Sequence, residues 1–293
     1  MRSFSFELLG SNDLPIRGEV HLPAANRSAS SAANGASDGA SVATVPCVLA
    51  VHGFKGFRRW GFWPATADRF TAAGLGFVSF DMSHNGVGPG GLQFDQEDLF
   101  ERNTFGRELH DLSQVLLALR AQAVPGSAEL DPTRIGLLGH SRGGGEVVVT
   151  AADDPALRCV VALAPIASNR RIPAAQVTEG LQRGFHPIVN SRTGQILRMG
   201  RDALEEIRDR DDLADFTEHA GRLSMPLLVA HGTADPAVSV EDGRRLAAAA
   251  PRGRFLPIEG ADHVLGCRHP WAGSNPDFDH FLDEAVAFVA QHA

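Results

Sequence analysis

Three kinds of feature are scarce in this sequence of 293 residues, and each scarcity excludes a class of protein. Cysteines number only three (Cys47, Cys159 and Cys267), and the first two fall within apolar runs, which favours reduced, buried thiols over a disulfide or a metal site. No apolar run could cross a bilayer, and the N-terminus has no signal-peptide pattern. Basic charge is also in deficit, since the formal net charge of −8 argues against nucleic acid as a partner. We therefore expect a cytoplasmic protein with no membrane partner.

Apolar runs and amphipathic stretches alternate along the rest of the chain. Continuous apolar runs, typical of strands covered on both faces, lie at 47–51, 76–81, 135–139, 159–164 and 226–230. Helical periodicity appears at about 63–73, 101–123, 143–152 and 277–291. The alternation predicts one large α/β domain with a mostly parallel sheet and helices on both faces. An antiparallel hairpin at 4–22 should open it, and Pro257 suggests that the last strand, 254–258, is at an edge.

Two segments interrupt this alternation. Residues 23–44, rich in Ala, Ser, Gly and Asn, are expected to form a flexible loop and receive no function. Between residues 165 and 225, two helical pieces (174–183 and 202–210) flank a stretch whose Thr193-Gly194 pair suits a hairpin turn. We expect residues 167–222 to be an inserted cap, with 1–166 and 223–293 as the core. The alternative is an ordinary long crossover.

One motif suggests chemistry. The sequence Gly139-His140-Ser141-Arg142-Gly143 follows an apolar strand and opens a helix, with glycines at the two places where a side chain would collide in a sharp turn. A serine at the tip of such a turn is held in a strained conformation with its hydroxyl exposed. The N–H groups of the following helix favour negative charge nearby. We therefore predict that Ser141 is a nucleophile.

A serine nucleophile needs a base, and the base needs a carboxylate to orient it. Asp235 and His263 each follow a predicted strand, so they should share the carboxyl edge of the sheet with Ser141. The order serine, aspartate, histidine is that of one hydrolase class. Each residue has an ordinary alternative: Asp235 is also suited to form a turn, and a loop histidine is usually solvated. His84 and Asp262 are weaker rivals, and the histidines at 269, 280 and 292 are expected at the surface.

The predicted serine also needs hydrogen-bond donors for an oxyanion. The backbone N–H groups of Arg142 and of Phe54, with Lys55 as second choice for the latter, are the candidates. The side chain of Arg142 is more simply expected to pair with Glu146 one turn on.

Substrate contacts are less defined by the sequence. Lys55 lies close to Arg58 and Arg59 and could attract an anionic substrate, although a solvated basic face is the simpler interpretation. Ile188, Leu197 and Met199 are candidates for an acyl pocket or, equally, for the small core of the insert.

These motifs, from Cys47 onward, resemble the α/β-hydrolase superfamily, and within it the dienelactone-hydrolase-like and cinnamoyl (feruloyl) esterase-like branch, which carries a small insert after the sixth strand. The resemblance covers the loop His52-Gly53-Phe54, the serine turn, and the stretches 231–235 and 260–263. It implies an eight-stranded, mostly parallel sheet and carboxylic-ester hydrolysis without a cofactor or metal. Dienelactone hydrolases proper have cysteine where this chain has Ser141, which favours ordinary esters over lactones.

The hypothesis is a serine esterase acting on a small-molecule ester through Ser141, His263 and Asp235. A peptidase or thioesterase with the same triad is an alternative, although the chain contains no large propeller-like domain of the kind found in oligopeptidases. A non-catalytic ligand-binding module on the same fold is another. The sequence leaves the oligomeric state open and is compatible with a homodimer.

Overall fold

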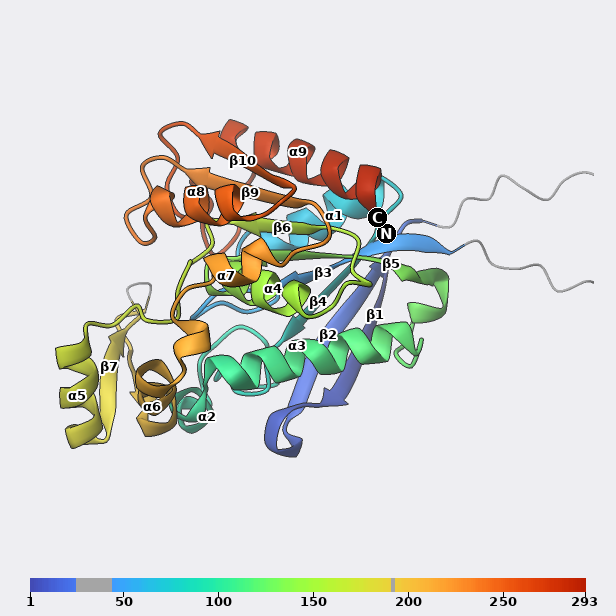
Figure 1. Ribbon diagram of the computed structural model, residues 1–293. Coiled ribbons are helices and arrows are strands. Elements are labelled where there is room, and N and C mark those ends of the chain that lie inside the picture. The colour runs from blue at the N-terminus through green and yellow to red at the C-terminus, as the bar shows by residue number, and fades with distance from the viewer. Residues whose placement is uncertain (25–43, 191–192) are drawn as a thin grey trace, which may run out of the picture.

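An eight-stranded sheet runs through the centre of the computed structural model, which describes residues 1–24, 44–190 and 193–293 (Figure 1). Across the sheet the strands are β1 (Arg2–Leu9), β2 (Pro15–Leu22), β4 (Gly76–Asp81), β3 (Val45–Val51), β5 (Leu130–His140), β6 (Val160–Leu163), β9 (Leu227–Gly232) and β10 (Gly253–Ile258). β2 is antiparallel to both of its neighbours, and the other six strands of the sheet after it (β4, β3, β5, β6, β9 and β10) are mutually parallel. The predicted fold class, the opening hairpin and the edge position of the last strand are confirmed.

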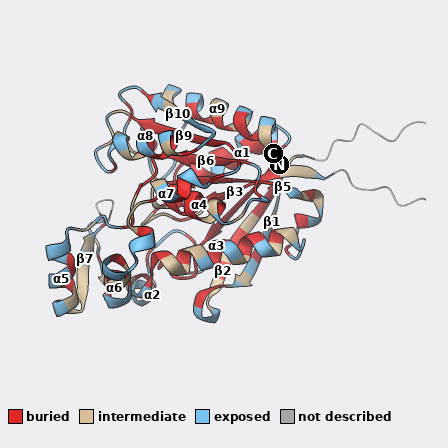
Figure 2. Cartoon of the chain, in the orientation of Figure 1, coloured by how far each residue is buried: buried red, intermediate tan, exposed pale blue. Residues whose placement is uncertain are grey.

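Helices cover both faces of this sheet, so its central strands are buried (Figure 2). One face packs against α1 (Trp63–Ala72) and α9 (Pro276–His292), and the other against α3 (Phe105–Arg120), α4 (Arg142–Ala152), α7 (Thr217–Gly221) and α8 (Val240–Ala249). In α9 the buried side chains recur at helical spacing from Phe278 to Val289, and each fully buried phenylalanine contributes about 1.5–3 kcal/mol. None of the helices in the described ranges is both long and apolar enough to span a bilayer.

The stretch expected to be one helix from residue 101 to 123 is instead two helices. α2 (Glu97–Arg102) ends before Asn103, whose backbone is extended, and α3 begins at Phe105. Thr104 is the N-cap of α3, because its hydroxyl oxygen accepts a hydrogen bond from the N–H of Arg107 at 3.1 Å. The capping chemistry of Thr104 therefore outweighs the apolar periodicity that runs across it. Short 3₁₀ helices occupy Ser11–Asp13, Ser127–Glu129 and Asp211–Leu213.

The segment between β6 and β9 lies to one side of the sheet and carries its own small hairpin (Figure 1). Its elements are α5 (Ala174–Arg183), β7 (Phe185–Val189), β8 (Ile196–Gly200) and α6 (Arg201–Asp209). β7 and β8 pair antiparallel, and Gly194 has a positive φ of 75° in the connection, in keeping with the predicted turn. The loop expected at 23–44 falls almost entirely outside the described residues.

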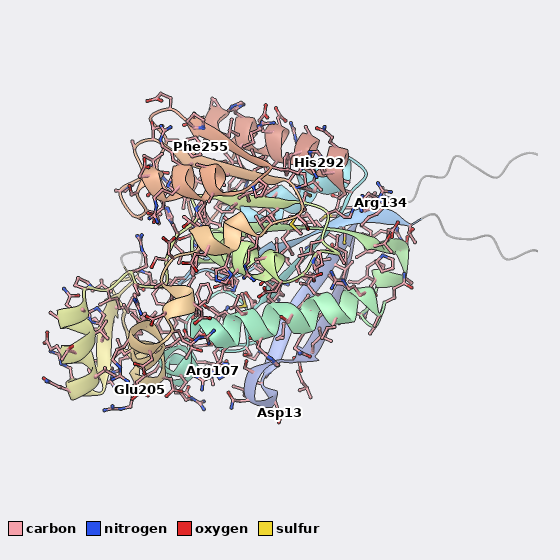
Figure 3. The ribbon with its side chains drawn as sticks, viewed as in Figure 1. Asp13, Arg107, Arg134, Glu205, Phe255 and His292 are labelled. Atoms are coloured by element: carbon pink, nitrogen blue, oxygen red, sulfur yellow. The ribbon has the colours of Figure 1, made fainter. Side chains whose placement is uncertain are left out.

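Polar contacts attach this segment to the helical layer. The carboxylate of Glu206 in α6 accepts hydrogen bonds from the N–H groups of Phe105 and Gly106, at 2.7 and 2.8 Å, in the first turn of α3. Arg107 of α3 lies beside α6 (Figure 3) and pairs with Asp202 at 2.9 Å. A helix N-terminus favours anions, so Glu206 satisfies free donors of α3 and stabilises its dipole at the same time.

All three cysteines are buried, and burial raises the pKa of each thiol to about 12. Because the thiolate is the reactive form, we expect Ellman's reagent to leave the native protein unlabelled over minutes and to react with three thiols once guanidinium chloride unfolds it. Absorbance at 412 nm measures the released thionitrobenzoate. Rapid labelling of the native chain would show that at least one thiol is accessible.

Candidate active site

Ser141 sits in the sharp turn that joins β5 to α4, with φ 58° and ψ −116°. A non-glycine residue at positive φ stores strain of about 1–3 kcal/mol, which the surrounding structure must sustain. A Cβ added at Gly139 would lie 2.1 Å from the carbonyl oxygen of Gly143, and one added at Gly143 would lie 2.4 Å from that of Val51. Only glycine fits at either position, so the two glycines are what allow the turn to present Ser141.

The structure brings Asp235 and His263 to Ser141. Nε2 of His263 lies 3.0 Å from Oγ of Ser141, and Nδ1 of the same ring lies 2.7 Å from Oδ2 of Asp235. Asp235 follows the end of β9 and His263 follows the end of β10, two neighbouring parallel strands. A hydroxyl, an imidazole and a carboxylate are thus in hydrogen-bonded sequence. This arrangement can transfer the serine proton to the imidazole while the carboxylate orients the ring.

The carboxylate of Asp235 is fully buried and has four donors around it. Its Oδ1 accepts from the N–H groups of Ala237 (2.7 Å) and Val238 (3.0 Å), while Oδ2 faces His263 and also Nε2 of His231 at 3.2 Å. Burial alone would raise the pKa of Asp235, but the hydrogen bonds from the two histidines and the backbone outweigh it and hold that pKa far below its ordinary value. Asp235 therefore stays ionised.

His231 is a member of this site that the sequence reasoning missed. Its ring is completely buried, and Nε2 faces two acceptors, Oδ2 of Asp235 and the carbonyl oxygen of Val238 at 3.1 Å, which assigns the proton to Nε2. A Cβ added at Gly243 would lie 2.6 Å from its Nδ1, so a glycine in α8 makes room for the ring. The available signal was its position at the end of β9, four residues before Asp235.

His140 packs against the imidazole of His263. Its ring centroid is 4.8 Å from that of His263, and its Nε2 donates to the backbone carbonyl oxygen of His263 at 3.0 Å. Burial, aided by the nearby His263, lowers the pKa of His140 to about 3, so its ring is neutral. A neutral donor at this place fixes the backbone of His263 without adding a charge beside the imidazole.

The two segments expected to supply oxyanion donors border the serine. A Cβ added at Gly53 would lie 2.9 Å from the Cβ of Ser141, so the loop after β3 passes directly against that serine. Within the described residues, neither the N–H of Phe54 nor that of Arg142 donates to another group of the protein. The loop is held in place through the N–H of Arg58, which donates to Asp81 at 2.7 Å.

The side chain of Arg142 is buried in a cluster of polar groups. Its Nε contacts the carboxylate of Glu108 and lies 3.5 Å from Glu146, while Nη1 donates to Oδ1 of Asn169 at 2.9 Å. The expected contact with Glu146 is therefore present, but Glu108 is nearer. Burial alone would lower the pKa of Arg142, and the two carboxyl groups more than reverse this. Burial and Glu108 raise the pKa of Glu146 well above its ordinary value.

Ser141 and His263 open on a cavity of about 690 Å³. Its apolar walls include Trp60, Trp63, Ile166, Ile172, Ile188, Met199, Ile207, Val238 and Val264. Lys55 also lies on the wall, but Leu197 is buried beside Phe57 and Phe100, so that candidate is not brought to the cavity. The expectation that His269 lies at the surface is wrong, because its ring lines the cavity and stacks on Trp60, with ring centroids 6.2 Å apart.

The rival residues have other partners. The carboxylate of Asp262 accepts from the N–H groups of Val264 (3.0 Å) and Gly266 (2.7 Å), which is the ordinary role of a turn-forming aspartate. His84 is buried and bonds to the hydroxyl of Ser83 at 2.8 Å, and it is absent from the cavity wall described above. Neither residue competes with Asp235 or His263.

The fold and this arrangement define a serine hydrolase of the α/β-hydrolase class. The chain belongs to the prolyl oligopeptidase family, whose model matches residues 65–266, more than half of its length. A curated relative, an uncharacterised 31.7 kDa protein of the traX–finO intergenic region of Escherichia coli, is 26% identical over 159 residues, which are 54% of this chain and 50% of the relative. The chain thus spans about half the length of the curated relatives that it matches.

Solved structures of similar fold include both esterases and a peptidase. Est1E from Butyrivibrio proteoclasticus with bound ferulic acid has a TM-score of 0.64 at 16% identity, covering 98% of this chain and 96% of that one. A puromycin-hydrolysing peptidase of Mycobacterium tuberculosis has a TM-score of 0.62 at 19% identity, covering 99% of this chain and 39% of that one. At such identities the likeness shows the fold alone.

Proposed function

We propose that this protein is an esterase that hydrolyses carboxylic esters through an acyl-enzyme. His263 removes the proton of Ser141 as its Oγ attacks the ester carbonyl, and Asp235 stabilises the imidazolium. The imidazolium then protonates the leaving alcohol, which departs as the acyl-serine forms. Water, deprotonated by His263, releases the acid and regenerates the serine. The observation that carries this proposal is the hydrogen-bonded line from Asp235 through His263 to Ser141, opening on an apolar cavity.

The backbone N–H groups of Phe54 and Arg142 are proposed as the oxyanion donors. Support comes from two observations: the loop of Phe54 passes against Ser141 and Arg142 directly follows it, and each N–H is without a protein acceptor among the described residues. Such donors stabilise negative charge that develops only in the transition state, and losing one typically costs about 100- to 1000-fold in rate.

We further propose that residues 167–222 serve as a cap that shapes substrate binding, with 1–166 and 223–293 as the core. Support comes from the cavity wall, to which this segment contributes Ile172, Ile188, Met199 and Ile207. Large apolar side chains of this kind suit an aryl or alkyl group better than a polar one.

Family membership makes peptide hydrolysis the second candidate. Against it stands the wall of the cavity, which in the described part of the chain has no Asp or Glu side chain to pair with the α-amino group of a short peptide. A thioester would use the same residues, and only its leaving group differs.

The proposal is tested with a panel of p-nitrophenyl, alkyl and hydroxycinnamoyl esters alongside aminoacyl p-nitroanilides and acyl thioesters of matched acyl size. We expect ester turnover and covalent labelling of the protein by a fluorophosphonate probe. Incubation with a slowly hydrolysed ester beforehand should delay the labelling, because the acylated serine cannot react with the probe. Faster cleavage of the anilides than of the esters would instead favour the peptidase. Absence of both labelling and turnover would leave a non-catalytic binding role.

A further inference from the structure

The charges on the cavity wall differ sharply from those of the whole chain. The sequence has 35 acidic and 27 basic residues, yet the wall carries four basic side chains and, among the residues that the structure describes, no acidic one. The four are Lys55, Arg142, Arg171 and Arg268. A concave site lined by one sign of charge raises the local concentration of oppositely charged ligands.

Two of these four charges are compensated from outside the cavity. Arg142 pairs with Glu108, as described above. Arg171 pairs with Asp242 at 3.1 Å and also donates to the carbonyl oxygen of Ala237 at 2.8 Å. Neither residue therefore needs a substrate to balance its charge.

The basic trio seen in the sequence is divided by the fold. Arg58 pairs with Asp81, and Arg59 pairs with Glu19, and neither arginine is among the residues that line the cavity. Lys55 alone faces the cavity, where its Nζ donates to the backbone carbonyl oxygen of Val189 at 3.0 Å. The three residues therefore do not form the solvated basic face that the sequence suggested: Arg58 and Arg59 are ion-paired, and Lys55 lies on the cavity wall.

Arg268 is the distinctive member of the four. Arg268 lies five residues beyond His263 and is exposed to solvent. Within the described residues, its guanidinium makes no ion pair and no hydrogen bond. Most arginines of the described chain, by contrast, pair with a carboxylate, as Arg69, Arg120 and Arg254 do. A guanidinium is suited to bind a carboxylate through two parallel hydrogen bonds.

We infer that the preferred substrates are esters whose apolar body ends in a carboxylate, which Arg268 binds with the field of Lys55 in support. The apolar walls would hold the body of such a hemiester, while the charged end stays at the exposed guanidinium, where desolvation costs little. This inference rests on the proposed esterase function and deepens it. Arg268 acts here on specificity and takes no part in the bond-breaking steps.

The test compares p-nitrophenyl butyrate with mono-p-nitrophenyl glutarate, which has the same leaving group and a carboxylate at the end of the acyl chain. We expect kcat/KM for the glutarate to exceed that for the butyrate by about tenfold at 10 mM salt, and the advantage to shrink at 0.5 M salt because the Debye length falls from about 30 Å to a few Å. Arg268→Gln should lower the glutarate-to-butyrate ratio about fivefold to tenfold, and Arg268→Glu should lower it further. Arg268→Lys keeps the charge but loses the paired hydrogen bonds, so its ratio should lie between those of the wild type and Arg268→Gln.

The matched control is Arg252→Gln. Arg252 is also exposed and lacks an ion pair in the described chain, but it lies before β10 and is absent from the cavity wall. It should leave the ratio unchanged. An unchanged ratio in Arg268→Gln and Arg268→Glu, with both esters still cleaved, would overturn the inference and leave the esterase proposal intact. Failure of the wild type to cleave either ester would overturn the esterase proposal first, and the inference with it.

Discussion

Replacing Ser141 with alanine is expected to lower kcat for ester hydrolysis by about 10⁵- to 10⁶-fold, because the proposed reaction has no other nucleophile. The methyl group of alanine fits where the serine Cβ already lies, and the positive φ of 58° is equally strained for both residues. We therefore expect the thermal unfolding midpoint to change little. Release of p-nitrophenol and loss of fluorophosphonate labelling measure the effect.

A variant that folds normally yet retains more than a hundredth of wild-type turnover would exclude Ser141 as the nucleophile. Ser168→Ala provides the matched comparison, because Ser168 lies outside the triad and its hydroxyl accepts from the N–H of Arg170 at 2.9 Å. It should leave turnover close to that of the wild type.

The second large effect is expected for Asp235→Asn, with a fall in kcat of about 10⁴-fold. The backbone N–H groups of Ala237 and Val238 fix an acceptor at one side-chain oxygen, so the new amide nitrogen must point at His263 and His231. An NH₂ group there cannot accept from Nδ1 of His263, and it also opposes the N–H of His231. The imidazole is then driven to the tautomer that cannot take the serine proton.

The same substitution has a signature in stability against pH. The folded-state pKa of Asp235 is lowered, so its ionised form contributes stability above the ordinary carboxyl pKa of about 4, and that contribution is lost progressively as pH falls below it. The unfolding midpoints of wild type and Asp235→Asn should therefore differ most near pH 7 and converge towards pH 3. Asp262→Asn, at the adjacent turn, is the control for both measurements and should keep most of the activity. Full activity of Asp235→Asn would contradict the assignment.

The sheet and the three central residues were predictable because they depend on short-range signals. An apolar run predicts a buried strand, parallel strands end at one edge, and the residues just past those ends must then be neighbours. Gly139 and Gly143 marked the turn because a sharp strand-to-helix turn leaves no room for a Cβ at either place. The break before α3 was missed because capping by Thr104 is a single hydrogen bond set against a long apolar pattern.

The cavity wall could not be predicted in the same way. Its residues come from the loop after β3, the serine turn, the segment after β6 and the loops after β9 and β10, and their positions depend on how those segments pack together. Leu197 and Met199 are two residues apart in β8 and so share one face of the strand, yet Leu197 packs in a buried cluster while Met199 reaches the wall. Arg268 and His269 gave no signal, since nothing in the sequence places the loop beyond His263 beside Trp60.

Glu206 links the segment between β6 and β9 to the rest of the fold in a way that constrains how related chains can diverge. Three successive N–H groups at the start of α3 are satisfied by two side chains, Thr104 from the core and Glu206 from the segment. A homologue that exchanged the whole segment to gain a new specificity would leave two of those amides bare unless it supplied another acid at that place. Replacement of this segment and the stability of the start of α3 are therefore coupled through the carboxylate of Glu206.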